Sequence, residues 1–159
     1  MTRRSLLLAL LLVPAAAFPA AALAYRIDSP GYALVRLPVR VITVYHATVE
    51  QTDDDPFTTA DGTTWNADTI AEQRIAALSR EMLDRWGGPV SYGDAIWVEI
   101  PGSDLSGVWW VRDTMRDKVY KRATGTWEPL RGYVDLLVPA HVMGCWQRGM
   151  RVYLIGGKQ

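Results

Sequence analysis

The segment Val39–His46, which reads VRVITVYH, is the clearest strand signal in the chain. Odd-numbered residues from Val39 to Tyr45 face one side of such a strand, and even-numbered residues from Arg40 to His46 face the other. β-Branched and aromatic side chains dominate the segment, as in strands that are half-buried in a sheet. We therefore predict a strand here.

Further segments continue the pattern toward the C-terminus. We predict strands at 94–101 (DAIWVEIP) and 107–114 (GVWWVRDT), which the turn GSDLSG joins, and at 133–139 and 149–157. Several short strands with few helices and frequent turns predict a mainly β fold, a small closed or partly closed β-barrel. On the strand 107–114, Trp109 and Trp110 must face opposite sides.

Two segments are less clear. Residues 66–86 (NADTIAEQRIAALSREMLDRW) have the propensity for one helix from 67 to 85, but RIAALS within them could be a short buried strand. Residues 139–146 (PAHVMGCW) look like one or two helical turns, and Cys145 in them is expected in the core.

The first 24 residues have the three parts of a secretory signal peptide. Arg3 and Arg4 form the basic part, Leu6–Val13 is apolar, and Ala22–Ala24 is a small-x-small cleavage site. The expected organisation is a signal peptide (1–24), an extended lead-in (25–38) and one domain (39–159). The protein is then exported to the periplasm or to the cell wall outside the cell, with no stable membrane span after cleavage. A retained N-terminal anchor is the alternative.

Composition narrows the possible partners. Cleavage removes two arginines and no acids, which leaves 15 basic and 17 acidic residues and a net charge of −2. A nucleic-acid partner is not expected, because such proteins usually carry a basic excess. A neutral glycan or a small polar ligand fits this charge better. One cysteine excludes an internal disulfide, and two histidines without a nearby cysteine pair give no reason to expect a metal or another cofactor. The oligomeric state stays open.

Three acids have unusual surroundings. Asp61 lies in FTTADGT (57–63), where Asp-Gly indicates a turn, Asp113 ends the strand 107–114, and Asp135 lies inside the apolar run YVDLLVP. An acid within a buried strand costs several kcal/mol unless it is paired or protonated. Asp135 is therefore either a hydrogen-bonded acid that stabilises the fold, or a carboxyl group with a raised pKa that is suited to general acid catalysis.

A set of segments resembles a known family. In order, VITVYHA, TTADGT, IAAL, YGDAIWVEIPG, GVWWVRDTM, YVDLLVP and GMRVYLIG resemble the three-aspartate (3D) domain, over about Val39 to Ile155. The resemblance implies a six-stranded double-psi β-barrel with one or two short helices. That fold is similar to the catalytic domain of membrane-bound lytic transglycosylase A and, more remotely, to RlpA-like and expansin barrels. It also implies that RIAALS is a strand.

The resemblance implies a function as well. Asp61 matches a corner of the family's Thr-Ala-x-Gly-Thr loop, Asp113 matches the aspartate at its strand end, and Asp135 matches the proposed acid/base of the lytic enzymes. The implied partner is the glycan strand of peptidoglycan, cleaved by a lytic transglycosylase-like reaction or by a glycoside hydrolase. In the implied site, the negative charge of Asp113 raises the pKa of Asp135, because like charges repel. Alternatives are a non-catalytic peptidoglycan- or polysaccharide-binding module, as in expansin-like barrels, and a structural or phage-related component.

The other candidate residues surround these acids. Thr59 and Thr63 flank Asp61, and Tyr45 and His46 end the first strand at an edge that lines the cleft in related barrels, although His46 could equally be a surface residue. Trp65 and Trp127 are the favoured glycan platforms. The sequence departs from the family after Asp113, where the stretch 114–132 lacks a glycine pair and is longer. The basic side chains in this stretch could contact the sugar or form a solvated loop; they are Arg116, Lys118, Lys121, Arg122 and Arg131.

Overall fold

In the computed structural model, residues 32–48 and 55–158 are described. The predicted signal peptide and the start of the predicted lead-in lie outside them. The strands are β1 (Tyr32–Arg36), β2 (Val41–Tyr45), β3 (Ile75–Leu78), β4 (Ala95–Glu99), β5 (Gly107–Thr114), β6 (Lys118–Lys121), β7 (Thr126–Pro129), β8 (Tyr133–Leu137), β9 (Cys145–Trp146) and β10 (Arg151–Lys158). The helical elements are the short α-helix α1 (Ile70–Gln73) and the 3-10 turns η1 (Ala67–Thr69), η2 (Arg80–Met82) and η3 (Asp84–Trp86). No helix in this described part is long and apolar enough to cross a membrane.

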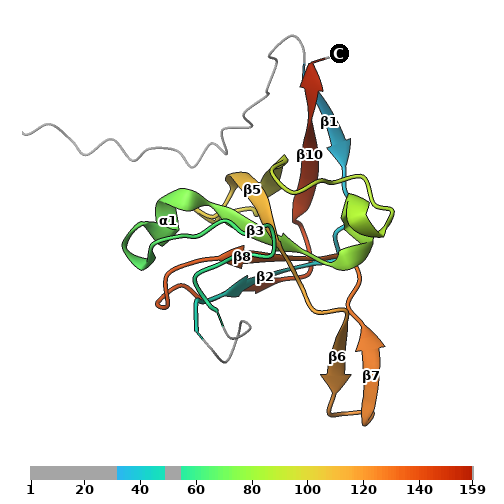
Figure 1. Ribbon diagram of the computed structural model, residues 1–159. Coiled ribbons are helices and arrows are strands. Elements are labelled where there is room, and N and C mark those ends of the chain that lie inside the picture. The colour runs from blue at the N-terminus through green and yellow to red at the C-terminus, as the bar shows by residue number, and fades with distance from the viewer. Residues whose placement is uncertain (1–31, 49–54, 159) are drawn as a thin grey trace, which may run out of the picture.

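Eight strands form one mixed sheet in the order β1-β10-β4-β5-β3-β8-β2-β9, while β6 and β7 form a separate hairpin that extends away from it (Figure 1). The predicted mainly β fold is confirmed. The predicted small β-barrel, a six-stranded double-psi barrel by the family resemblance, is not formed, because the main sheet has eight strands and is not closed. Strand β9 contributes only two residues at one edge, so the ladder ends there and does not return to β1.

Strand β3 lies in the middle of the sheet, parallel to β5 and antiparallel to β8. The prediction that RIAALS contains a strand is confirmed, and one helix over 67–85 is not formed. Arg74 adopts a left-handed conformation (φ 49°) at the end of α1 and turns the chain into β3. All four β3 residues are buried, because Ala76 and Leu78 face one apolar cluster and Ile75 and Ala77 face another.

The two apolar clusters lie on opposite faces of the central strands. The main core contains Trp109, Ile96 and Leu136, and the smaller cluster consists of Tyr45, Trp65, Ile70, Ile75, Ala77 and Leu137. Trp109 is 1 % exposed and Trp110 is 44 % exposed, so their predicted opposite orientation is confirmed. The smaller cluster supports the side of the sheet on which the candidate site lies.

Residues 139–146 differ from the prediction. They form turns and then β9, which pairs with β2, so the predicted helical turns are absent. Cys145 is exposed, and its predicted core position is wrong. Because side chains alternate along a strand, Trp146 packs against the main core while its neighbour Cys145 faces away from it.

Candidate functional site

The site begins as a row of residues across four adjacent strands. Ala77 on β3 is paired with Asp113 on β5 and with Asp135 on β8, and Asp135 is paired with Thr43 on β2. Residues paired laterally in a sheet point to the same face. The two carboxyl groups therefore share one face, about 10 Å apart at the backbone, with the small side chain of Ala77 leaving open space between them.

A β-bulge gives Asp113 this orientation. Along β3, Ala76 is paired with Val111 and Ala77 with Asp113, so Arg112 is an inserted residue without a partner on β3. Trp109 and Val111 face the main core, and uninterrupted alternation would turn Asp113 to that face too. The inserted residue re-aims Asp113 to the opposite face, which is a known effect of bulges.

Asp135 is a largely buried carboxyl group. The Thr43 hydroxyl donates a hydrogen bond to its Oδ1 over 2.7 Å. Burial, with a contribution from the charge of Asp113, raises the pKa of Asp135 from 3.8 to about 6, although the Thr43 hydrogen bond and nearby His46 act in the opposite direction. The carboxyl group thus exchanges its proton in mildly acidic solution, as a general acid does.

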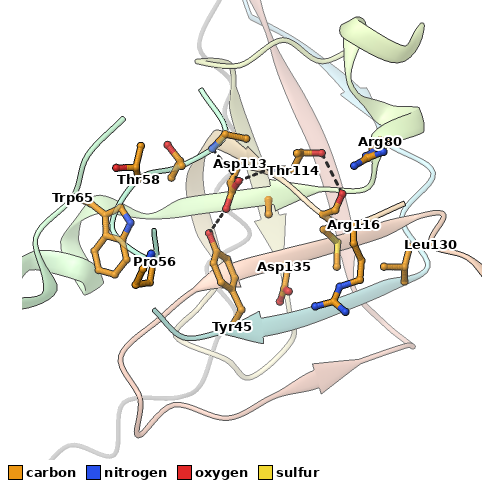
Figure 2. Close-up of a pocket in the computed structure, with 14 residues that line it drawn as sticks. Tyr45, Pro56, Thr58, Trp65, Arg80, Asp113, Thr114, Arg116, Leu130 and Asp135 are labelled. Atoms are coloured by element: carbon orange, nitrogen blue, oxygen red, sulfur yellow. Dashed lines mark hydrogen bonds between the residues drawn. The ribbon is translucent and has the colours of Figure 1, made fainter. Parts of the chain in front are cut away.

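Asp113 has different surroundings. The Tyr45 hydroxyl donates to Oδ2 over 3.1 Å, and the backbone N–H groups of Ala60 and Thr114 donate to Oδ1 over 3.1 and 2.8 Å. Hydrogen bonds from such donors stabilise the negative charge of a carboxylate. Burial and the charge of Asp113 raise the pKa of Tyr45 well above its ordinary value, so the phenol keeps its proton. It donates the hydrogen bond to Asp113 that Figure 2 shows as a dashed line.

Asp61 lies in the turn of the loop 57–63 and also links this loop to β5. Its Oδ1 accepts hydrogen bonds from the Thr59 hydroxyl (2.7 Å) and the Thr63 N–H (2.9 Å), and its Oδ2 pairs with Arg112 (3.2 Å). Burial acts to raise the pKa of Asp61, but these hydrogen bonds outweigh burial and hold it below its ordinary value. The link between Asp61 and Arg112 holds the Ala60 N–H within hydrogen-bond distance of Asp113.

A cavity of about 490 Å³ opens on this face (Figure 2). Its volume lies in the range of sites for small ligands. The lining residues are Tyr45, Pro56, Thr58, Thr59, Ala60, Trp65, Ala77, Arg80, Asp113, Thr114, Met115, Arg116, Leu130 and Asp135. The cavity therefore brings together five of the predicted site residues, which are Tyr45, Thr59, Trp65, Asp113 and Asp135.

Four predicted residues do not line this cavity. Asp61 and Thr63 support the loop beside it. His46 is buried, with Nε2 2.9 Å from the Val142 carbonyl oxygen, so the alternative of a surface histidine is wrong. Trp127 is 64 % exposed on β7 and contacts Tyr120 on β6 across the hairpin.

Sequence reasoning missed Thr43, Ala77, Arg80 and Arg112 as site residues. For Thr43 a signal existed, because strand alternation already placed it on the same face as Tyr45. The bulge at Arg112 and the pairing of Ala77 with both acids leave no local trace in the sequence.

Within residues 32–48 and 55–158, no three His, Cys, Asp or Glu side chains lie close enough together to hold a metal ion. Comparison of the chain with protein-family models found no match, and comparison with curated proteins found none either. The cavity itself holds one carboxyl group whose pKa is raised to about 6 and one that accepts hydrogen bonds from Tyr45, Ala60 and Thr114.

Proposed function

We propose that the chain is an exported cell-wall protein that cleaves peptidoglycan glycan strands by a lytic transglycosylase-like reaction. The observation that carries this proposal is the presence of two carboxyl groups with unlike surroundings in one cavity. Such a division is how enzymes assign acid and base roles to two similar groups. The resemblance to the three-aspartate domain supplies the substrate class.

In this reaction Asp135 acts twice. Thr43 binds Oδ1, so the proton is donated from Oδ2 to the glycosidic oxygen, and the bond from that oxygen to C1 of the muramic acid breaks. The resulting carboxylate then takes the proton of the 6-hydroxyl of the same sugar. The 6-oxygen bonds to C1 and closes an anhydro ring, so one carboxyl group serves as acid and then as base.

Asp113 assists without exchanging a proton. Its negative charge helps Asp135 to hold a proton before the reaction. As the glycosidic bond breaks, the sugar gains positive charge at C1, and a fixed carboxylate nearby stabilises that charge. Tyr45 and the Ala60 N–H hold Asp113 in place through their hydrogen bonds.

A second candidate function is glycan binding without cleavage. The hairpin β6–β7 favours it, because the aromatic pair Tyr120 and Trp127 is exposed there, with ring centroids 5.4 Å apart, and lysines flank the pair on β6. Exposed aromatic rings are suited to stacking on sugar faces.

The test uses the purified protein and three variants with purified peptidoglycan, followed by mass spectrometry of the released fragments. Asp135→Asn and Asp113→Asn alter the cavity, and Asp104→Asn makes the same change at an exposed acid elsewhere. We expect anhydro-muramyl products from the parent and Asp104→Asn, and none from Asp135→Asn. Reducing-end products indicate a hydrolase. Sedimentation with the wall but no release by any of the four proteins indicates the binding module.

A further inference from the structure

Two arginines line the end of the cavity that the carboxyl groups do not occupy. Strands β3 and β5 are parallel, and Leu78 is paired with Thr114 at their C-terminal ends. Arg80 and Arg116 each follow two residues after this pair. Because the C-terminal ends of neighbouring parallel strands lie at one edge of a sheet, both arginines reach the same cavity.

Figure 2 shows how the cavity is divided. In this view Pro56, Thr58 and Trp65 lie on one side, Asp113 and Asp135 lie in the middle, and the arginines lie on the other side with Leu130. The lining thus changes from a loop with one aromatic ring, through two acids, to a basic and apolar end.

Neither arginine is neutralised by an acid in the described part of the chain. Ion pairs there join Arg112 to Asp61 and Arg151 to Glu99. The guanidinium group of Arg80 lies 5.3 Å from the ring of Trp86, and its Nε is buried without a hydrogen-bond partner among these residues. A buried donor without a partner destabilises the folded protein, and a bound acceptor removes that cost. The basic end is therefore suited to an anion that enters the cavity.

We infer that this end of the cavity binds a free carboxylate on the muramic acid, so that the preferred substrate is a glycan strand whose muramic acid carries no peptide rather than one whose carboxyl group is bonded to a peptide as a neutral amide. The inference rests on the proposed function for the identity of the sugar. Guanidinium groups bind carboxylates through two parallel hydrogen bonds, which fixes orientation as well as adding affinity. Leu130 and Met115 offer apolar contact to the alkyl part of the substituent. Repulsion from the Asp113 carboxylate directs the sugar carboxylate to the arginines, which leaves the glycosidic oxygen toward the protonated Asp135.

The experiment compares N-acetylmuramic acid with its methyl ester, which lacks the negative charge and carries one additional methyl group. Binding is followed by NMR through the Nε–H signal of Arg80 and the indole N–H signal of Trp65. We expect the acid to bind about tenfold more tightly than the ester, from charge-assisted hydrogen bonds. Arg80→Gln and Arg116→Gln should each reduce this preference, and Arg80→Lys should restore part of it.

Arg85→Gln is the matched control. Arg85 stacks on the same Trp86 ring at 5.4 Å but does not line the cavity, so its variant should keep the full preference for the acid. Arg116 is exposed, so its variant tests the inference even if the Arg80 variants fold poorly. Equal binding of acid and ester by the parent overturns the inference, as does a preference that survives in both glutamine variants.

D-lactate alone separates this inference from the proposed function. If lactate shifts the Arg80 signal in the parent while glycan strands are not cleaved, the anion site stands and the proposed function fails. If strands are cleaved but neither lactate nor N-acetylmuramic acid shifts that signal, the anion site is wrong and the proposed function stands.

Discussion

The cavity and the β6–β7 hairpin both carry residues that the sequence predicted to contact a glycan, but the protein holds them in different ways. Asp135 lies on β8 with a paired strand on each side, and its neighbours leave it largely buried. Trp127 lies on a two-stranded hairpin and is 64 % exposed. Such a hairpin has few neighbours to order it. The sheet therefore suits chemistry that needs fixed geometry, and the hairpin suits contact with a ligand of variable shape.

The largest expected difference between the two regions is in cleavage rate. Asp135→Asn removes the proton donor of the proposed reaction, so we expect the rate to fall by about 10²–10⁴-fold. Trp127→Ala should lower it by less than about tenfold, because it removes a binding contact alone. Initial rates of release of soluble fragments from peptidoglycan give both values. Equal losses in the two variants would contradict the assignment of chemistry to the cavity.

The cleavage rate should also fall with rising pH, because Asp135 loses its proton. The donor is protonated below its pKa of about 6, so the rate should fall as the pH rises above that value. A rate that increases through pH 6 to 8 in the parent would contradict a general acid at this position.

The second largest effect concerns stability. The folded chain holds the proton of Asp135 more tightly than the unfolded chain, because its pKa is raised from 3.8 to about 6. This contribution to stability is present below about pH 4 and is lost as the pH rises through 6, by about 3 kcal/mol in all. Urea unfolding of the parent and of Asp135→Asn at pH 4 and pH 7.5 should show the variant gaining by that amount at the higher pH.

The control for that measurement is Asp104→Asn, at an exposed position, which should show no such gain. The free energies of unfolding of the parent and of Asp135→Asn could instead differ by the same amount at both pH values. That result would show that the pKa of Asp135 is not raised by folding, and that burial in the cavity does not alter its charge.

A smaller effect is expected at the loop that borders the cavity. Asp61→Ala removes the acceptor of hydrogen bonds from Thr59, Thr63 and Arg112, so we expect a loss of about 1–2 kcal/mol in the free energy of unfolding. Amide exchange at Ala60 should become faster, because the loop loses the bond between the Asp61 side chain and Arg112 and keeps its backbone N–H bonds to β5. Asp61→Asn keeps one acceptor and should lose less. Unchanged exchange at Ala60 would show that the backbone N–H bonds of residues 60 and 61 to β5 hold the loop without the Asp61 side chain.

The smallest effect is expected in the hairpin itself. Trp127→Ala removes one ring of an exposed cross-strand pair, so the free energy of unfolding should change by less than about 1 kcal/mol. Sedimentation with peptidoglycan should nevertheless weaken several-fold. Trp110→Ala, which removes an exposed ring from the main sheet, is the control. If that variant weakens sedimentation equally, the hairpin has no special role in binding.

Much of the strand content was predictable from local patterns. Residues 41–45, 95–99, 107–114, 133–137 and 151–157 lie within predicted strands, because β-branched and aromatic residues alternate there. Strand β3 needed the family resemblance, since its short apolar run fits a helix equally well. The hairpin β6–β7 was not predicted, because charged residues conceal its alternation, and β9 was mistaken for helical turns.

Several residues of the site could be predicted from the sequence, but their arrangement in space could not. The sequence alone determined that Asp135 is an acid inside an apolar strand, that Asp61 lies in a turn, and that Trp109 and Trp110 face opposite sides, because each of these follows from neighbours along the chain. Only the tertiary structure decided that Asp113 shares a face with Asp135, that Thr43 binds an acid 92 residues away, and that Arg80 and Arg116 reach one cavity. These depend on strand register and on one inserted residue at Arg112, and register is set by pairing between segments that are distant in the chain.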